Sequence, residues 1–135
     1  MAKTNSFKIA ELIRAIEYDV SNDVIVTSKI VNSKTSKAGS LTTTATTEVA
    51  LDTFAHASFR AARYVIAMKE GSDYHSTEVV LVHDGSAVTL TAYGTLKSST
   101  LATFDADINS GIVRLKFSPT KTNTSIKLRA IRTTA

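Results

Sequence analysis

The chain has 135 residues, of which 43% are hydrophobic and 21% are charged, and its net charge at pH 7 is +4. This length supports one compact domain and excludes a large multidomain enzyme, while the apolar fraction and the low net charge exclude an unfolded tail. Cysteine is absent, which excludes disulfides, thiolate nucleophiles and cysteine-ligated zinc.

The N-terminal segment carries charges where a signal peptide has its apolar stretch, and no apolar run approaches the roughly 18 residues of a membrane span. We expect synthesis in a cytoplasm and no membrane partner. The segment instead predicts an amphipathic helix that Ser6 caps and that ends near Asp19. Its apolar stripe, spaced i, i+3, i+4 and i+7, consists of Ile9, Leu12, Ile13 and Ile16. Because an isolated helix of about 12 residues is marginal in water, we expect this stripe to contact a partner subunit or the chain's own sheet.

Strands are predicted after the helix. Residues 20–32 favour a strand, residues 32–40 (NSKTSKAGS) favour a loop, and residues 41–51 alternate cleanly between two faces. Threonine occurs 20 times and serine 15 times, and threonine-rich alternation is typical of strands. Small residues fill much of both faces of residues 41–51, so this strand is expected at a sheet edge or a subunit contact.

The remainder of the chain shows short strands at regular spacing. Turns are predicted at residues 70–73, at Asp84-Gly85 and at residues 109–111, and Pro119 ends a strand because proline cannot donate to a ladder. The predicted fold class is mainly β, an antiparallel β-sandwich or barrel-like meander with one N-terminal α-helix. We divide the chain into an N-terminal helix and extended anchoring arm, 1–48, and a β-sandwich module, 49–135. Tyr64, Ile66 and Met68 are predicted to share one face of a strand, and Val113, Leu115 and Phe117 are predicted to share a face opposite to Arg114 and Lys116.

No constellation of catalytic residues is apparent. His75 and His83 stand at the two ends of one predicted strand, about 26 Å apart, whereas two ligands of one metal lie within about 4 Å of each other. Asp105 and Asp107 precede a turn and lack further calcium ligands at the required spacing. Glycine-rich phosphate loops and a nucleophile elbow are also missing. The sequence therefore predicts no enzyme, no catalytic residue, no cofactor and no metal site.

The C-terminal third is basic, since no acidic residue follows Asp107. Arg114 and Lys116 share one face of a strand, and Lys127 and Arg129 share a face of the next. If these two strands pair, the four residues form a basic stripe suited to phosphate contacts. The alternative is a solvated face or a contact for an acidic protein. The stacking aromatics of single-strand binders are missing from this region, because its one aromatic residue, Phe117, points the other way.

From about residue 49 to residue 132, the sequence resembles a β-domain of virion structural and tail-fibre-like proteins of marine bacteriophages, cyanophages in particular. The resembling strings include FRAARY at 59–64, VHDG at 82–85 and TFD at 103–105. The resemblance implies a structural role on the particle and no catalytic residues. Because the chain holds one such module plus an extension, it favours a small component of the virion, as a head decoration protein or a neck or tail attachment protein.

Three functions follow as hypotheses. The first is a virion structural protein that forms a homo-oligomer and binds other virion proteins, with the helix stripe as contact. The second is a host-binding module for surface glycans, with Tyr74 and Tyr93 available for stacking. The third is a nucleic-acid-binding protein that uses the basic stripe.

Overall fold

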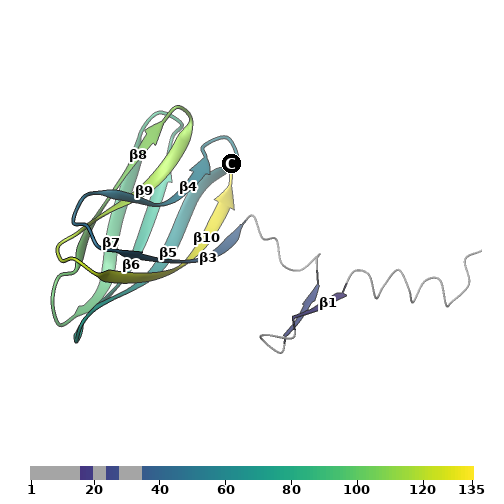
Figure 1. Cartoon of the computed structure of the whole chain (residues 1–135). Coiled ribbons are helices and arrows are strands. Elements are labelled where there is room, and N and C mark those ends of the chain that lie inside the picture. The colour runs from purple at the N-terminus through teal and green to yellow at the C-terminus, as the bar shows by residue number, and fades with distance from the viewer. Residues whose placement is uncertain (1–15, 20–23, 28–34) are drawn as a thin grey trace, which may run out of the picture. The chain divides into compact units, whose positions relative to one another are not determined.

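The computed structural model describes residues 16–19, 24–27 and 35–135 (Figure 1). The chain divides into two compact units, Met1–Lys34 and Thr35–Ala135. In the first unit, strands β1 (Ile16–Asp19) and β2 (Val24–Thr27) form an antiparallel pair in which Ile16 lies opposite Thr27. No helix in the described part of the chain is long and apolar enough to cross a membrane.

The predicted N-terminal helix is wrong over its last four residues. Ile16 belongs to β1, whereas Ile9, Leu12 and Ile13 lie outside the described residues. The segment IEYD pairs with VIVT, a run of β-branched residues with high strand propensity. The helical spacing of residues 9–16 carries no information on that partner strand, so the sequence pattern assigned residues 16–19 to the wrong type of element.

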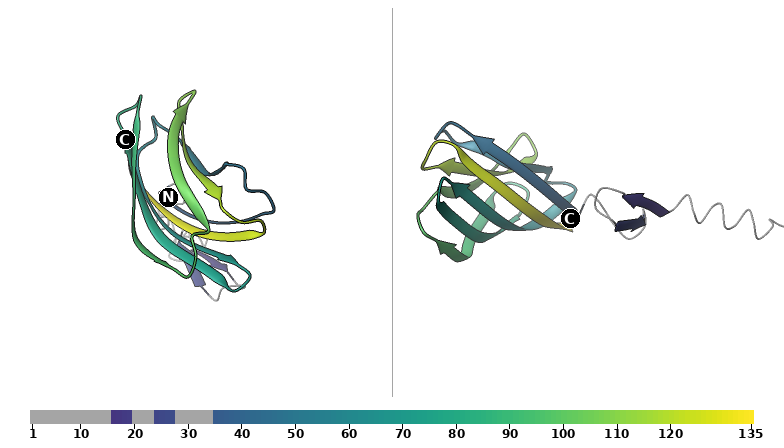
Figure 2. Two further views of the ribbon diagram at one scale, coloured as in Figure 1. Left: turned by 90° about the vertical axis from the view of Figure 1, so that its left-hand side faces the viewer. Right: turned by 60° about the horizontal axis from the view of Figure 1, so that its bottom comes forward.

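The second unit is a sandwich of two antiparallel sheets (Figures 1 and 2). One sheet has five strands in the order β3-β10-β5-β6-β7, and the other has three in the order β4-β9-β8. The predicted sandwich is thereby confirmed. The strands are β3 (Ser36–Thr43), β4 (Val49–Ala55), β5 (Phe59–Glu70), β6 (Asp73–His83), β7 (Val88–Lys97), β8 (Ala102–Asn109), β9 (Ile112–Pro119) and β10 (Thr124–Thr134).

Alternation of buried and exposed residues along each strand defines the core. Tyr64, Ile66 and Met68 share a face of β5 and Val113, Leu115 and Phe117 share a face of β9, as predicted, and all six are buried. Each fully buried apolar side chain of this size contributes about 1.5–3 kcal/mol. The core between the sheets also contains Phe54, Val79, Leu81, Leu101, Ile126 and Leu128.

The turn predictions are confirmed at three hairpins. Residues 71–72 join β5 to β6, residues 84–87 join β6 to β7, and Ser110 and Gly111 join β8 to β9. Gly111 has a φ of +78°, and a Cβ atom there would lie 3.2 Å from the His56 ring. Both the positive φ and the close approach of the His56 ring favour glycine at this turn.

Two predictions about residues 32–51 are wrong. Ser36–Ser40 were assigned to a loop but form the first five of the eight residues of β3, and the single strand predicted at 41–51 is interrupted between Thr43 and Val49. The Thr43 hydroxyl accepts a hydrogen bond from the Ala45 amide at 3.2 Å, so the side chain competes with the ladder and turns the backbone. Because β3 pairs with β10, the sheet begins within the segment 1–48 that was assigned to the arm. The anchoring role of residues 1–48 stays a prediction.

A buried ionic cluster joins the two sheets. The Asp52 side chain on β4 is fully buried and accepts hydrogen bonds from Lys37 Nζ at 2.6 Å, Tyr64 Oη at 3.0 Å and Arg132 at 2.6 Å. These three donors belong to β3, β5 and β10. The Arg132 guanidinium also lies 5.3 Å from the centre of the Phe54 ring. Burial alone would raise the pKa of Asp52, but the hydrogen bonds from Lys37 and Arg132 outweigh it and lower the pKa below its usual value.

The two ends of this unit lie side by side. The Arg132 amide donates to the Thr35 carbonyl at 2.7 Å, and the Ala135 amide donates to the Ser58 carbonyl at 3.1 Å. The unit therefore begins and ends at the same end of the sandwich.

Candidate binding surfaces

The outer face of the five-stranded sheet holds a shallow groove. Small outward-facing residues of β3 and β5, together with Lys127 and Arg129 of β10, enclose about 530 Å³. A second hollow of about 340 Å³ shares Val65 and Arg129 with it and extends towards Ile131. The groove is lined by Ala38, Gly39, Ser40, Val65, Ala67, Lys127, Leu128 and Arg129.

This outer face is positively charged. Its outward-facing charged side chains are four cations and one carboxylate, from strands β5, β6 and β10: Arg63, Lys69, Lys127, Arg129 and Glu78. Arg63 forms an ion pair with Glu78. Within residues 35–135, neither Lys127 nor Arg129 has an ion-pair partner, so both cations beside the groove are available to a ligand.

Two exposed tyrosines lie on the same face. Tyr74 is 58% exposed and Tyr93 is 41% exposed, and the alternation of β6 and β7 directs both outward. The Tyr93 hydroxyl donates to Glu78 at 2.9 Å, and this hydrogen bond raises the pKa of Tyr93. The glycan hypothesis named these two tyrosines as candidates, and they lie on the same outer face as the groove, on the neighbouring strands β6 and β7.

The outer face of the three-stranded sheet differs from that of the five-stranded sheet because its cations and carboxylates form ion pairs with one another. Arg114 on β9 donates two hydrogen bonds of 2.6 Å to Asp107 on β8. Lys116 lies 2.9 Å from Glu48 and 3.3 Å from both Asp105 and Asp107. The hydrogen bond to Glu48 is the largest of the contacts that raise the pKa of Lys116. The two aspartates thus act as partners for strand β9.

The four residues of the predicted basic stripe do not form one surface. The stripe required the strands that carry them to pair, but β9 belongs to the three-stranded sheet and β10 to the five-stranded sheet. Arg114 and Lys116 therefore lie on one outer face of the sandwich, and Lys127 and Arg129 lie on the other. Adjacent strands in the sequence were assumed to be adjacent in the sheet, and the crossover between the sheets breaks that assumption. Of the contact stripe, only Ile16 falls in the described residues, and its contact role stays a prediction.

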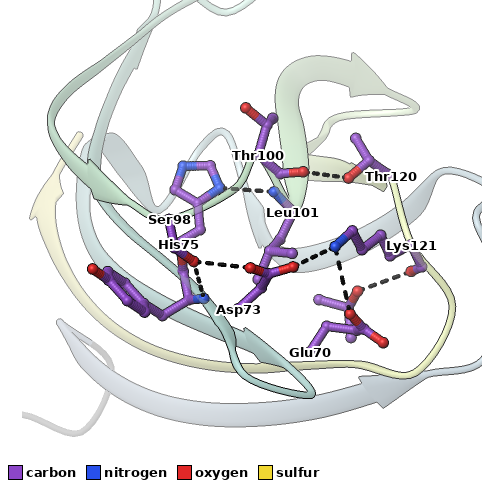
Figure 3. Close-up of polar contacts among 10 residues, drawn as sticks. Glu70, Asp73, His75, Ser98, Thr100, Leu101, Thr120 and Lys121 are labelled. Atoms are coloured by element: carbon purple, nitrogen blue, oxygen red, sulfur yellow. Dashed lines mark hydrogen bonds and ion pairs between the residues drawn. The ribbon is translucent and has the colours of Figure 1, made fainter.

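One end of the sandwich is closed by a polar network that links three connections (Figure 3). Lys121, between β9 and β10, forms ion pairs with Asp73 and with Glu70 at the β5–β6 turn. Ser98, between β7 and β8, donates to Asp73 at 3.1 Å. Hydrogen bonds from Lys121 and Ser98 lower the pKa of Asp73. These contacts are internal to the fold, so we assign the network a structural role.

The histidines lie at different ends of the sandwich. His75 Nδ1 accepts a hydrogen bond from the Leu101 amide at 3.3 Å (Figure 3), and burial lowers the pKa of His75. His83 contacts the Phe59 carbonyl at 2.6 Å, and the His56 ring lies 6.1 Å from the His83 ring. In the described part of the chain, no group of three or more histidine, aspartate or glutamate residues is placed to hold a metal ion.

Two solved structures resemble this chain in part. The tailspike protein of Acinetobacter phage vB_ApiP_P1 covers 72% of the chain with a TM-score of 0.47 and 16% identity. The tailspike protein of Acinetobacter baumannii phage AM24 covers 73% with a TM-score of 0.43 and 12% identity. The chain spans only 21% and 25% of those two proteins. No family model and no curated protein matches the sequence.

Both are phage tailspikes. The similarity is distant, because both TM-scores are below 0.5 and both identities are below 25%.

Proposed function

We propose that this chain is a non-enzymatic component of a phage virion whose sandwich binds an anionic glycan on the outer face of the five-stranded sheet. The resemblance of residues 49–132 to phage virion β-domains supports the assignment to a particle. The observation that carries the binding role is the groove of about 530 Å³ bordered by Lys127 and Arg129, two cations without an ion-pair partner among residues 35–135.

Charge favours an acidic ligand on this face. Four cations face one carboxylate, and that carboxylate is already bonded to Arg63 and Tyr93. A second copy of the same positive face would be repelled, whereas uronate or sialate carboxylates would be attracted. Arginine and lysine bind carboxylates through charge-assisted hydrogen bonds, which are about twice as strong as neutral ones.

The remaining groups on the face suit a sugar better than a nucleic acid. Ser36 and Ser40 stand at outward-facing positions of β3, and Tyr74 and Tyr93 provide flat apolar surfaces for sugar rings. Binding along the phosphate backbone of a nucleic acid requires a continuous row of cations. Here Glu78 lies in the centre of the face.

The test measures binding of the full chain to acidic polysaccharides (polygalacturonate, hyaluronate and alginate), with neutral dextran and single-stranded DNA as comparisons. We expect binding to an acidic polymer that weakens with added salt as the charges are screened. The double variant Lys127→Gln/Arg129→Gln is expected to bind about tenfold more weakly, equivalent to about 1.4 kcal/mol. The matched control Arg114→Gln/Lys116→Gln removes two charges from the opposite face and is expected to bind normally.

Several outcomes would contradict the proposal. Failure to bind every acidic polysaccharide would reject the glycan ligand. Equal losses in the two double variants would reject the groove as the site. Tighter binding to single-stranded DNA than to the polysaccharides would instead support the nucleic-acid hypothesis.

A further inference from the structure

The free edge of strand β7 contains a bulge at Gly94, but unlike the other three edge strands of the sandwich it carries a charge only at its last residue. Each sheet has two edge strands, which are β3 and β7 in one and β4 and β8 in the other. Exposed edges normally carry charges that discourage pairing with another chain. β3 carries Lys37, β4 carries Asp52, and β8 carries Asp105 and Asp107. β7 has the sequence VTLTAYGTLK and carries no charge before its last residue, Lys97.

β7 is also poorly covered by its own fold. All residues from Thr91 to Lys97 are exposed, including Ala92, which faces inward. Leu96, at 73% exposure, is the most exposed large apolar side chain in the described residues. A hollow of about 280 Å³ opens between β7 and β8 beside Ala92 and Phe104. The sandwich therefore leaves both the hydrogen-bonding edge and part of the inner side of β7 open.

Two unpaired charges stand at opposite ends of this strand. Asp84 lies in the turn before β7, where it accepts hydrogen bonds from the Ser86 and Ala87 amides. Lys97 ends β7 and donates to the Thr100 hydroxyl at 2.8 Å. Neither residue has an ion-pair partner within residues 35–135.

We propose that β7 pairs antiparallel with β7 of a second copy of this chain. With the two-fold axis at Thr91, Lys97 of one copy lies beside the turn of residues 84–87 of the other, and so close to Asp84, because the bulge at Gly94 shifts the simple residue count by one. Each Lys97 then meets the Asp84 of its partner, and the two lysines lie far apart. Such an interface is self-complementary and joins the two five-stranded sheets into one. On the axis Thr91 of one copy lies opposite Thr91 of the other, and Thr89 lies opposite Tyr93, cross-strand pairs that stabilise antiparallel sheets.

The pairing has a geometric consequence for the outer face. A two-fold axis perpendicular to the sheet keeps both outer faces on the same side. The groove lies among β3, β10 and β5, at the far side of each sheet from β7, so pairing covers neither groove. Two grooves on one surface would bind a polymer with higher avidity than one.

The experiment measures the mass of the full chain by size-exclusion chromatography with light scattering over a range of concentrations. We expect a dimer of twice 14.5 kDa. Thr91→Lys places like charges opposite each other on the axis and is expected to give a monomer with an unchanged circular dichroism spectrum. The matched control Thr42→Lys adds the same charge to the exposed outer face of β3, the other edge of the same sheet, and is expected to remain dimeric.

A charge exchange tests the contact itself. Asp84→Lys and Lys97→Asp are each expected to weaken the dimer at least tenfold, and the double variant is expected to restore it. The double variant still lacks the Asp84 carboxylate that stabilises the turn before β7. A recovered dimer therefore cannot be explained by restored stability of that turn. A wild-type chain that stays monomeric to about 100 µM, a trimer, a Thr91→Lys variant that stays dimeric, or a double variant without recovery would each overturn the proposal.

Discussion

Replacing Asp52 by asparagine tests whether the buried ionic cluster holds the two sheets together. The substitution keeps the shape of the side chain but removes the charge that Arg132 and Lys37 share. The Asp52 side chain has no exposed surface and that of Arg132 is only 9% exposed, so Arg132 would be left largely buried beside a neutral amide. Breaking a buried ion pair by removing one partner costs about 3–5 kcal/mol.

The contribution of Lys37 to this figure is small. Its side chain is 45% exposed, and ion pairs with such exposure contribute about 0.2–1 kcal/mol. The Tyr64 hydroxyl loses a charged acceptor in the same variant, and a hydrogen bond to a charged group is worth about 1.5–3 kcal/mol. We expect a total loss of about 3–5 kcal/mol and a fall in Tm of about 12 °C or more for a unit of this size.

The assay is urea and thermal unfolding of the full chain. Asp105→Asn is the matched control because the Asp105 side chain is 69% exposed, and we expect it to change stability by less than about 0.5 kcal/mol. Lys37→Gln is expected to cost less than about 1 kcal/mol. An Asp52→Asn variant within about 1 kcal/mol of the wild type would refute the reasoning.

The effect of Asp52 must also depend on pH in a definite direction. Its pKa is lowered in the folded state, so the carboxylate stabilises the fold at pH values above its usual pKa of 3.8. That contribution is lost as the pH falls through the lowered pKa. The stability difference between wild type and Asp52→Asn is therefore expected to be constant from about pH 5 to pH 8 and to shrink below about pH 4.

Two further predictions concern turns. Gly111→Ala is expected to destabilise the protein by at least about 1 kcal/mol more than Gly71→Ala. Both positions have positive φ, but of the two only the Gly111 Cβ would contact His56. Equal losses in Tm for the two variants would contradict this reasoning. Asp84→Ala is expected to lower Tm at pH 7. Because hydrogen bonds from the Ala87 and Ser86 amides lower the pKa of Asp84 to about 2, the difference should vanish as the pH falls through about 2, and one that persists at lower pH would contradict the assignment.

Much of the sandwich could be predicted because the signals for its strands and turns lie within short stretches of the sequence. Strict alternation marks the inward faces of β5 and β9, and Asp84-Gly85 and Pro119 mark where strands turn or end. The break between β3 and β4 could not be predicted in the same way. The threonine-rich run alternates without interruption, and the turn arises from a hydroxyl that bonds the backbone.

The binding surfaces were harder to predict because they depend on strand order. Lys127 and Arg129 were identified as a basic pair, but the assignment of Arg114 and Lys116 to the same face failed when the strands joined different sheets. Asp52 was not recognised as a buried anion because its partners lie 12, 15 and 80 positions away. A lone aspartate within an otherwise apolar and small strand, VALDTFA, is the one local signal that pointed to it.

The adjacent ends of residues 35–135 make this unit simple to transplant. The hydrogen bond between Arg132 and Thr35 fixes the first and last strands at one point, so a linker of a few residues would close the backbone into a ring. A closed ring can be reopened at another surface turn, and an open unit can be inserted into a loop of an unrelated host without stretching either chain. Insertion at this point would leave the opposite end of the sandwich free of backbone connections to the host.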